Sequence, residues 1–353
     1  MPIEIAGRFV GTRADVFVIA EIGLNHGGSL DAALALVDAA AQAGASAVKL
    51  QTLRADGLVA GHCPPPAHVD VRSLRDFFRT FELDEAAHVE VARAARARGL
   101  AFLSTPFDLE AVDLLERVGV DAFKIASGDI THRALIERAA RTGRPLVIST
   151  GMSTLDEVRT AVDWARTAGA TQMAALHCVS AYPAPAGSEN LRAITTLADA
   201  LGIPVGLSDH SPSAEALVLL PALGGSIYER HIVDTDESDA IDRAVSSTPA
   251  ELRSAIEGAR RTTLALGHGV KRCLPAEAVN RDGSRRGLYT LRALRKGATV
   301  SAADVVALRP ADGIAASYIH TVIGAVVARD IASGQAIAWD DIQTAGSEVR
   351  RAV

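Results

Sequence analysis

The sequence predicts an α/β protein in which a (β/α)8 TIM barrel is followed by a small C-terminal module. Short β-branched apolar runs recur eight times, Ala- and Leu-rich amphipathic stretches lie between them, and the composition changes after about residue 268. Strands that alternate with helices indicate a parallel sheet, and eight of them favour closure into a barrel over an open, doubly wound sheet, the main alternative. The 353 residues suffice for a barrel of about 250 residues and one further module.

The predicted strands are short apolar runs. They cover 16–23, 47–51, 101–106, 122–127, 145–150, 173–179, 204–209 and 226–232. The clearest helical patterns between them cover 30–44, 84–99 and 155–169. Each of these three ends on Gly, the residue favoured just after the last helical turn.

The predicted organisation is a barrel over 1–267, a linker over 268–287 and a compact module over 288–353. The linker has few apolar residues. Within the module, 296–305 and 333–342 form a weak repeat: in both copies Gly is followed three residues later by a β-branched residue and seven residues later by Asp. A turn, a short strand and an Asp-started helical turn fit each copy.

Composition excludes several classes of protein. The net charge is −6 with no basic block, so we expect no nucleic-acid partner. No run of about 18 apolar residues is present, so we expect no membrane span. Cys63, Cys178 and Cys273 are widely spaced without a CxxC pair, which favours reduced thiols over a disulfide or zinc framework. Together with the absence of a signal-peptide pattern, this leads us to expect a cytoplasmic protein.

Polar or ionisable residues end nearly every predicted strand. In a barrel these carboxyl ends converge on one face, where the active sites of this architecture lie. One or two such groups are ordinary at strand ends, but groups at all eight ends predict a polar pocket. They include Glu21, Lys49, Gln51, Ser104, Thr105, Lys124, Ser127, Ser149, Thr150, Ser180, Ser208, Glu229 and His231.

His210 and His231 are the candidate metal ligands. Glu229 and His231 are two residues apart on a strand and therefore point to the same face, while His210 follows the neighbouring strand. Two imidazoles from adjacent strands, with a carboxylate nearby, suit a first-row divalent cation such as Mn²⁺ or Zn²⁺. The alternative is that these residues are unrelated polar strand ends.

Lys49 and Lys124 are the candidate anion-binding residues. An isolated buried ammonium is costly, so two lysines facing a pocket indicate an anionic ligand. The hydroxyls near them extend this to a cradle for phosphate and carboxylate oxygens. Each hydroxyl alone fits a strand-end hydrogen bond better than a ligand contact, so the inference depends on the set. Those hydroxyls belong to Thr105, Ser127, Ser149 and Ser208. Glu21 and Gln51 are placed to orient a hydroxylated substrate or to relay a proton.

Eight motifs in register with the predicted strands resemble the N-acetylneuraminate (sialic acid) synthases. They are FVIAEIGLNHGGS at 17–29, VKLQT at 48–52, LSTPFD at 103–108, KIASGD at 124–129, ISTGM at 148–152, HCVSAYPAP at 177–185, GLSDHS at 206–211 and YERHI at 228–232. The tail from residue 306 onwards, VALRPADGI, resembles the antifreeze-like (SAF) module of these enzymes, a β-clip fold.

The resemblance implies a transferase that condenses phosphoenolpyruvate (PEP) with an N-acylated hexosamine aldehyde, such as N-acetylmannosamine. The product would be a nine-carbon 2-keto-3-deoxy (nonulosonic) acid, with release of phosphate. It assigns the metal to His210 and His231, with Mn²⁺ first and Mg²⁺ or Co²⁺ as alternatives. It implies catalytic roles for Glu21, Gln51 and Glu229. The implied PEP contacts are Lys49, Thr105, Lys124, Ser127, Ser149, Ser180 and Ser208.

The resemblance also implies a domain-swapped homodimer. In that arrangement Tyr182 contacts the sugar, and Arg309 of the SAF module reaches the sugar's acyl group across the dimer. The chain departs from the family pattern in its sugar half: Val179 and Ser180 replace the usual Thr-Asn, and Arg243 stands where His is expected. The segment 53–74 lacks the polar substrate-loop residues of the family. N-acetylmannosamine therefore need not be the acceptor.

Two alternatives stay open. One is the same PEP condensation on an unusual aldehyde sugar of a specialised-metabolite pathway. The other is a non-catalytic, sugar-binding barrel, which predicts loss of the metal or PEP residues. Both histidines and both lysines are present, which counts against this second alternative.

Overall fold

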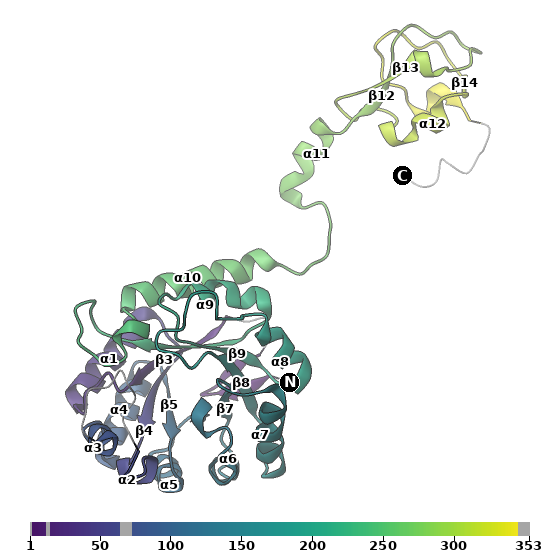
Figure 1. The fold of residues 1–353 in the computed structure, drawn as a ribbon. Helices are drawn as coiled ribbons and strands as arrows, with labels where there is room; N and C mark the ends of the chain where they lie inside the picture. The colour runs from purple at the N-terminus through teal and green to yellow at the C-terminus, as the bar shows by residue number, and fades with distance from the viewer. Residues whose placement is uncertain (1, 12–14, 64–72, 345–353) are drawn as a thin grey trace. The chain divides into compact units, whose positions relative to one another are not determined.

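The chain folds into two compact units, one up to Gly267 and one from His268 (Figure 1). The computed structural model describes residues 2–11, 15–63 and 73–344. Each unit has a hydrophobic core of its own.

The first unit is a closed barrel of eight parallel strands. Strands that follow one another along the chain pair in parallel, and the last of them, β10, pairs with both β9 and β3. This closure confirms the predicted TIM barrel. The doubly wound alternative, which requires an open sheet, is wrong. The strands are β3 (Phe17–Gly23), β4 (Ala47–Thr52), β5 (Ala101–Pro106), β6 (Ala122–Ile125), β7 (Leu146–Ser149), β8 (Met173–Cys178), β9 (Val205–Asp209) and β10 (Ile227–Ile232).

Helices surround the strands, as Figure 1 shows. The three predicted helices are confirmed to within two residues, as α1, α4 and α7. Ser29 accepts a hydrogen bond from the Ala32 amide at the start of α1, and Gly44 ends this helix with φ +79°. The barrel helices are α1 (Leu30–Ala43), α2 (Ala55–Leu58), α3 (Leu74–Arg79), α4 (Glu85–Ala97), α5 (Leu109–Val118), α6 (Arg133–Ala140), α7 (Leu155–Thr167), α8 (Ala193–Leu201), α9 (Glu215–Leu219) and α10 (Pro249–Leu266). Within the described ranges, no helix is long and apolar enough to cross a membrane.

Side chains inside the barrel belong to alternate residues of each strand. An inner apolar cluster includes Phe17, Ile19 and Leu103 near the strand starts. The hairpin of β1 (Ile3–Ile5) and β2 (Arg8–Val10), which the sequence patterns did not predict, adds its apolar side chains to this cluster. The amino end of the barrel is therefore filled with apolar side chains.

The same alternation makes the carboxyl end of the barrel polar. Glu21 lies two residues after Ile19, and Lys49 lies two residues after Ala47 in the inner cluster. Since strand side chains alternate between the two faces, these ionisable groups continue the inner rows. The fold therefore directs buried charges into the barrel mouth.

The second unit is built around two short antiparallel pairs. Strand β12 (Gly287–Thr290) pairs with β13 (Val305–Leu308), and β14 (Val326–Val327) pairs with β15 (Ile342–Gln343). The weak sequence repeat has a structural basis, because Asp304 and Asp341 are both buried and accept hydrogen bonds from the backbone amides of Ser301 and Ala338. The segment predicted as a linker contains a short helix, α11 (Ala278–Ser284).

Candidate active site

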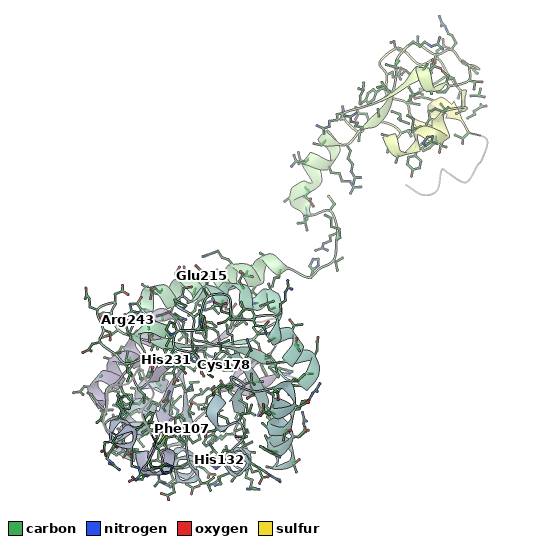
Figure 2. All side chains as sticks on the ribbon, viewed as in Figure 1. Phe107, His132, Cys178, Glu215, His231 and Arg243 are labelled. Atoms are coloured by element: carbon green, nitrogen blue, oxygen red, sulfur yellow. The ribbon has the colours of Figure 1, made fainter. Side chains whose placement is uncertain are left out.

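A cavity of about 780 Å³ lies at the carboxyl ends of the barrel strands. Figure 2 shows two of its lining residues, Cys178 and His231, within the barrel. The cavity is lined by all the barrel residues to which the sequence assigns a metal, substrate or catalytic role: Glu21, Lys49, Gln51, Thr105, Lys124, Ser127, Ser149, Ser180, Tyr182, Ser208, His210, Glu229 and His231. Ser104 and Thr150, which were also expected at the polar pocket, do not line it, and their hydroxyls donate to the carbonyls of Leu50 and Leu176. The remaining predicted residue, Arg309, is exposed on the second unit.

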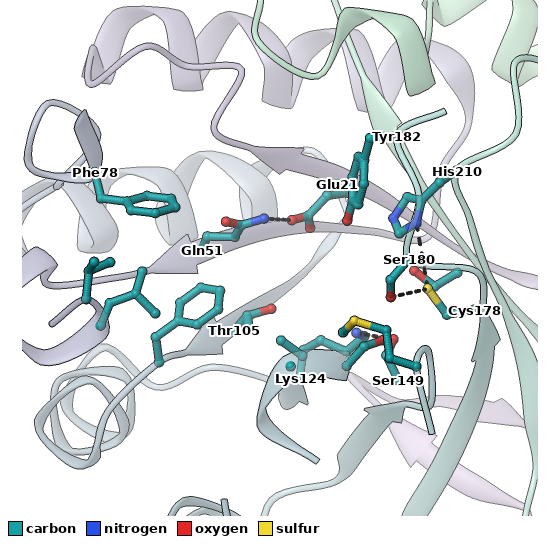
Figure 3. Close-up of a pocket in the computed structure, with 18 of the residues that line it drawn as sticks. Glu21, Gln51, Phe78, Thr105, Lys124, Ser149, Cys178, Ser180, Tyr182 and His210 are labelled. Atoms are coloured by element: carbon teal, nitrogen blue, oxygen red, sulfur yellow. Dashed lines mark hydrogen bonds between the residues drawn. The ribbon is translucent and has the colours of Figure 1, made fainter. Parts of the chain in front are cut away.

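Lys49 is held by ionic and hydrogen-bond partners from neighbouring strands. Its Nζ lies 2.6 Å from Glu21 Oε2 and donates a hydrogen bond to Thr105 Oγ1 at 2.8 Å. Gln51 Nε2 donates to the other oxygen of Glu21 at 3.0 Å (Figure 3). Burial acts to lower the pKa of Lys49, but the charges of Glu21 and Glu229 outweigh it, so the pKa is raised and the ammonium stays charged.

Lys124 occupies the other side of the same charge cluster. Its Nζ donates to Ser149 Oγ at 2.5 Å and lies 3.4 Å from Glu229 Oε1, which accepts a hydrogen bond from Ser208. Burial lowers the pKa of Lys124, and the nearby Lys49 charge lowers it further, against the opposing effect of Glu229. For Glu229, burial acts to raise the pKa, but the charges of both lysines outweigh it and lower it. The carboxylate is therefore ionised.

Hydroxyl and backbone groups lie beside Lys124. The Gly151 amide donates to Ser127 Oγ at 3.0 Å. A Cβ at Gly151 would lie 2.2 Å from Ser180 Oγ and 2.9 Å from Ser127 Oγ, so any larger residue would displace one of these hydroxyls. The cluster of small residues leaves room for an anionic group next to the ammonium.

His210 is held in one orientation by its surroundings. Its Nδ1 lies 3.0 Å from the Val179 carbonyl oxygen, which only accepts hydrogen bonds, so Nδ1 carries the proton and Nε2 keeps a lone pair. The Tyr182 ring stacks on the imidazole at 4.1 Å between centroids (Figure 3). Burial acts to lower the pKa of His210, but the hydrogen bond and charge of Cys178, whose Sγ is 3.7 Å away, outweigh it and raise the pKa.

His231 lies beside His210 on the neighbouring strand. The two ring centroids are 5.7 Å apart. His231 Nδ1 is 3.3 Å from Asp242 Oδ2, close enough for an ionic contact but not aligned as a hydrogen bond. A Cβ at Gly23 would lie 3.0 Å from this imidazole, so Gly at that position makes room for the ring. Burial lowers the pKa of His231, which keeps the imidazole neutral.

The two histidines fit a divalent metal that keeps open coordination positions. Two imidazoles on adjacent strands offer nitrogen ligands, and the contact of His231 with Asp242 is the kind that orients a metal-binding histidine. Across the described ranges, no group of three or more His, Cys, Asp or Glu side chains has a metal-binding arrangement. The remaining ligands would therefore come from water or substrate, as is usual at catalytic sites.

Cys178, which lines the cavity, and Asp242, which contacts His231, are among the residues that were not assigned to the site from the sequence. Cys178 continues the inner row after Ala174 and Leu176, so strand alternation is a signal that places it in the cavity. Asp242 comes from the loop after β10 and shows no such signal, because it is eleven residues beyond His231 in irregular structure.

Comparison with known proteins identifies the family. Residues 36–271 match the NeuB family model, and residues 285–343 match the SAF domain model. The chain belongs to the NeuB family. It is 34% identical over 342 residues to the N,N'-diacetyllegionaminic acid synthase of Legionella pneumophila, a match that covers 94% of this chain and 96% of that protein. It is 35% identical over 361 residues to the spore coat polysaccharide biosynthesis protein SpsE of Bacillus subtilis, covering 96% of both chains.

A solved structure of a sugar-acid synthetase has a similar fold. The N-acetylneuraminic acid (sialic acid) synthetase of Leptospira borgpetersenii is 31% identical, with a TM-score of 0.72 over 79% of this chain and 95% of that chain. The expected TIM barrel with a C-terminal SAF domain is thereby confirmed, as is the family resemblance. The curated relatives include proteins named as legionaminic and pseudaminic acid synthases, which are sugar-acid synthases of differing product.

Proposed function

We propose that this NeuB-family protein condenses PEP with the open-chain aldehyde of an N-acylated hexosamine, giving a nonulosonic acid and phosphate. The observation that carries the proposal is the cavity in which Lys49 and Lys124, both 3% exposed, lie among carboxylates, hydroxyls and two imidazoles. Buried lysines beside hydroxyls and a Gly-backed space suit the phosphate and carboxylate of PEP. The names of the relatives support a sugar-acid product.

In this proposal the lysine side of the cavity binds PEP. Lys124 contacts the phosphate together with the hydroxyls of Ser127, Ser149 and Ser180, while Lys49 and Thr105 contact the carboxylate and Ser208 helps to position it. Fixing both anionic groups orients C3 of PEP toward the aldehyde, so that orientation and electrostatic complementarity supply a large part of the catalysis.

His210 and His231 would hold the divalent metal, with Mn²⁺ as the first candidate. When bound, the metal would supply Lewis-acid polarisation of the aldehyde oxygen. The protein's own contribution is to orient the two imidazoles, His210 through the Val179 carbonyl and His231 through Asp242.

The proposed reaction forms one C–C bond, consumes one water molecule and releases inorganic phosphate. C3 of PEP attacks the aldehyde carbon, the aldehyde oxygen takes a proton, and positive charge develops at C2. Water adds to C2 and loses a proton, and the resulting hemiketal phosphate expels inorganic phosphate by C–O cleavage to leave the 2-keto group. Glu21, which pairs with Lys49, and Glu229, which pairs with Lys124, are the candidates for moving these protons, and Gln51 fixes the Glu21 carboxylate.

The proposal extends to the sugar side and to assembly. Tyr182, stacked on His210, would contact the acceptor, and Arg309 would contact its acyl group from the partner subunit of a domain-swapped homodimer.

Acceptor-dependent phosphate release tests the proposal. Purified protein with PEP and Mn²⁺ is mixed with a panel of N-acylated hexosamines, with omission of acceptor as the control. We expect phosphate release only with an acceptor, accompanied by a product whose mass is that of a nonulosonic acid. His231→Ala should abolish release while the far-ultraviolet circular dichroism spectrum stays unchanged.

Extending the panel to other aldehyde sugars, and measuring sugar binding beside phosphate release, separates the alternatives. Release with an aldehyde outside the hexosamines would favour the specialised-metabolite alternative. Binding of sugars without phosphate release from any aldehyde would favour the non-catalytic barrel and overturn the proposal.

A further inference from the structure

Asn25 joins the loop after the first barrel strand to the loop after the last one. It follows β3, and its side chain makes hydrogen bonds to residues that lie 207 to 221 positions later in the chain. Its Nδ2 donates to the Ile232 carbonyl at 2.9 Å and to Ser246 Oγ at 3.0 Å, and its Oδ1 accepts from the Asp242 amide at 3.0 Å. This side chain therefore helps to close the barrel at its carboxyl end.

The contacts fix which way round the Asn25 amide group lies. The Ile232 carbonyl only accepts hydrogen bonds and the Asp242 amide only donates them, so Nδ2 faces the first and Oδ1 faces the second. Exchanging the two atoms would bring oxygen against oxygen and N–H against N–H. A carboxylate of the same shape cannot make this set of contacts, because it has no N–H to donate.

The peptide groups on both sides of Asp242 are held in this way. Its amide donates to Asn25 Oδ1, and its carbonyl accepts from Ser246 Oγ at 2.7 Å, the same hydroxyl to which Asn25 Nδ2 donates. Asn25, Asp242 and Ser246 thus form a closed ring of hydrogen bonds, which we call the amide clamp.

The amide clamp holds the residue whose carboxylate contacts His231. Asp242 Oδ2 lies 3.3 Å from His231 Nδ1, a buried nitrogen without an aligned hydrogen bond in the described part of the chain. Asp242 lies in a turn and belongs to no barrel strand. Its place beside the imidazole therefore depends on contacts such as those of Asn25.

We propose that Asn25 is a positioning residue for the divalent metal. It holds Asp242 against His231 and thereby sets the orientation of this ligand and the metal affinity of the site. The inference rests on the function proposed above, in which His210 and His231 hold the metal. It adds a residue that is not among those lining the cavity and that acts through Asp242.

Mn²⁺ binding to an isosteric variant tests this role. Asn25→Asp keeps the shape of the side chain but sets an oxygen against the Ile232 carbonyl, so the amide clamp cannot form. Purified protein without PEP is titrated with Mn²⁺, and free Mn²⁺ is followed by electron paramagnetic resonance. We expect the Kd to rise by ~10- to 100-fold, the usual effect of losing a group that supports a metal ligand. The added negative charge alone would favour the cation, so a higher Kd reports the lost geometry.

Three further variants complete the titration. His231→Ala should remove the Mn²⁺ binding that depends on the histidines. Asn190→Asp makes the same chemical change at an exposed asparagine of the loop after β8 and should leave the Kd unchanged. Ser246→Ala removes only the contact to the Asp242 carbonyl and should raise the Kd by ~3-fold, about the effect of one hydrogen bond. It keeps the inference testable if Asn25→Asp does not fold.

Excess metal distinguishes positioning from a general structural role. The amide clamp acts on how firmly the metal is held, so phosphate release by Asn25→Asp should be slow at low Mn²⁺. It should return to within ~3-fold of the rate of the unaltered protein when Mn²⁺ saturates the site. The KM for PEP, measured at saturating Mn²⁺, should stay unchanged.

The outcomes separate this inference from the proposed function. If Mn²⁺ binding depends on His231 but the Kd is the same in Asn25→Asp, the positioning role is overturned and the proposed function stands. Slow phosphate release that saturating Mn²⁺ does not restore would also overturn the role, because it would indicate a general structural defect. Absence of Mn²⁺ binding through His231 would overturn both this inference and the proposed metal site.

Discussion

Lysine is rare in this chain, and where it occurs is informative. Of 36 basic residues only four are lysines: Lys49, Lys124, Lys271 and Lys296. The first two are buried in the barrel mouth, and the other two are exposed. A compact ammonium with rotatable donors fits among hydroxyls and carboxylates in a narrow interior better than a planar guanidinium does. The two buried lysines therefore occupy the positions of the proposed anion contacts, whereas most other basic residues of the chain are arginines.

Removing the Lys124 charge should impair PEP use. Lys124→Met keeps most of the side-chain volume but leaves the phosphate without its ammonium, so we expect kcat/KM for PEP to fall by ~100- to 1,000-fold. Lys296→Met, on an exposed lysine of the second unit, is the matched control and should leave kcat/KM unchanged. Steady-state kinetics with varied PEP measure both, and an equal effect of the two substitutions would contradict the assignment.

His26 should make folding stability depend on pH. This side chain is 1% exposed, and burial lowers its pKa from 6.5 to about 4, with the neighbouring His88 adding to the effect. Between pH 6.5 and about 4, the unfolded chain therefore binds a proton at His26 that the folded chain does not bind. Stability contributed by neutral His26 is complete above pH 6.5 and is lost as the pH falls toward 4, by up to about 3 kcal/mol.

Chemical denaturation at pH 7.5 and pH 5 measures this dependence. His26→Gln should show a smaller loss of unfolding free energy between the two values than the unaltered protein. Replacing the exposed His268 by Gln provides the control and should leave the loss unchanged. A pH dependence that His26→Gln does not reduce would show that other groups cause it.

At the scale of elements, alternation along the strands explains how much the sequence could predict. The eight strands and the inward direction of Glu21, Lys49 and Lys124 follow from runs of fixed period and from strand geometry. The β1–β2 hairpin, Asp242 and the lining residue Phe78 did not follow, because they lie in short turns, a loop or a two-turn helix where no period links a residue to the cavity. The described part of the segment 53–74, expected to lack polar substrate residues, contributes mainly uncharged side chains to the lining, among them Leu58 and Val59.

A buried network of hydrogen bonds and one ion pair links β9 to β10, the two strands that position His210 and His231. Arg230 is 1% exposed; its Nη1 lies 3.5 Å from Asp209 Oδ2, and its Nε donates to Ser247 Oγ at 2.5 Å. The Tyr228 hydroxyl donates to the same Asp209 oxygen at 2.6 Å. Since Asp209 and Arg230 each adjoin a candidate metal ligand, the network sets the relation between His210 and His231.

Breaking this network should destabilise the barrel. Arg230→Met leaves the Asp209 carboxylate buried without its cation, and we expect a loss of about 3 to 5 kcal/mol in unfolding free energy. Arg166→Met removes an exposed ion pair with Asp163 on α7 and should cost less than about 0.5 kcal/mol. Urea denaturation followed by circular dichroism measures both. Equal small losses would mean that the buried pair contributes no more than a surface pair.

At the scale of the whole molecule, the proposed role of the second unit is testable through Arg309. If this exposed arginine contacts the acceptor's acyl group in a domain-swapped homodimer, Arg309→Ala should raise the KM of the acceptor by ~10-fold or more and leave that of PEP nearly unchanged. Arg295→Ala, which removes an exposed partner of Asp330, is the control. Light scattering should give twice the chain mass of 36.8 kDa. A monomer with full acceptor affinity would contradict this part of the proposal.

The account as a whole depends on a divalent metal and PEP meeting in one cavity at the barrel mouth. Crystals soaked with MnCl₂ and PEP, measured at the manganese absorption edge, test this most directly. We expect an anomalous peak within about 2.2 Å of a nitrogen of both His210 and His231, with PEP oxygens contacting Lys49 and Lys124. Manganese bound elsewhere, or PEP bound away from the two lysines, would contradict the account.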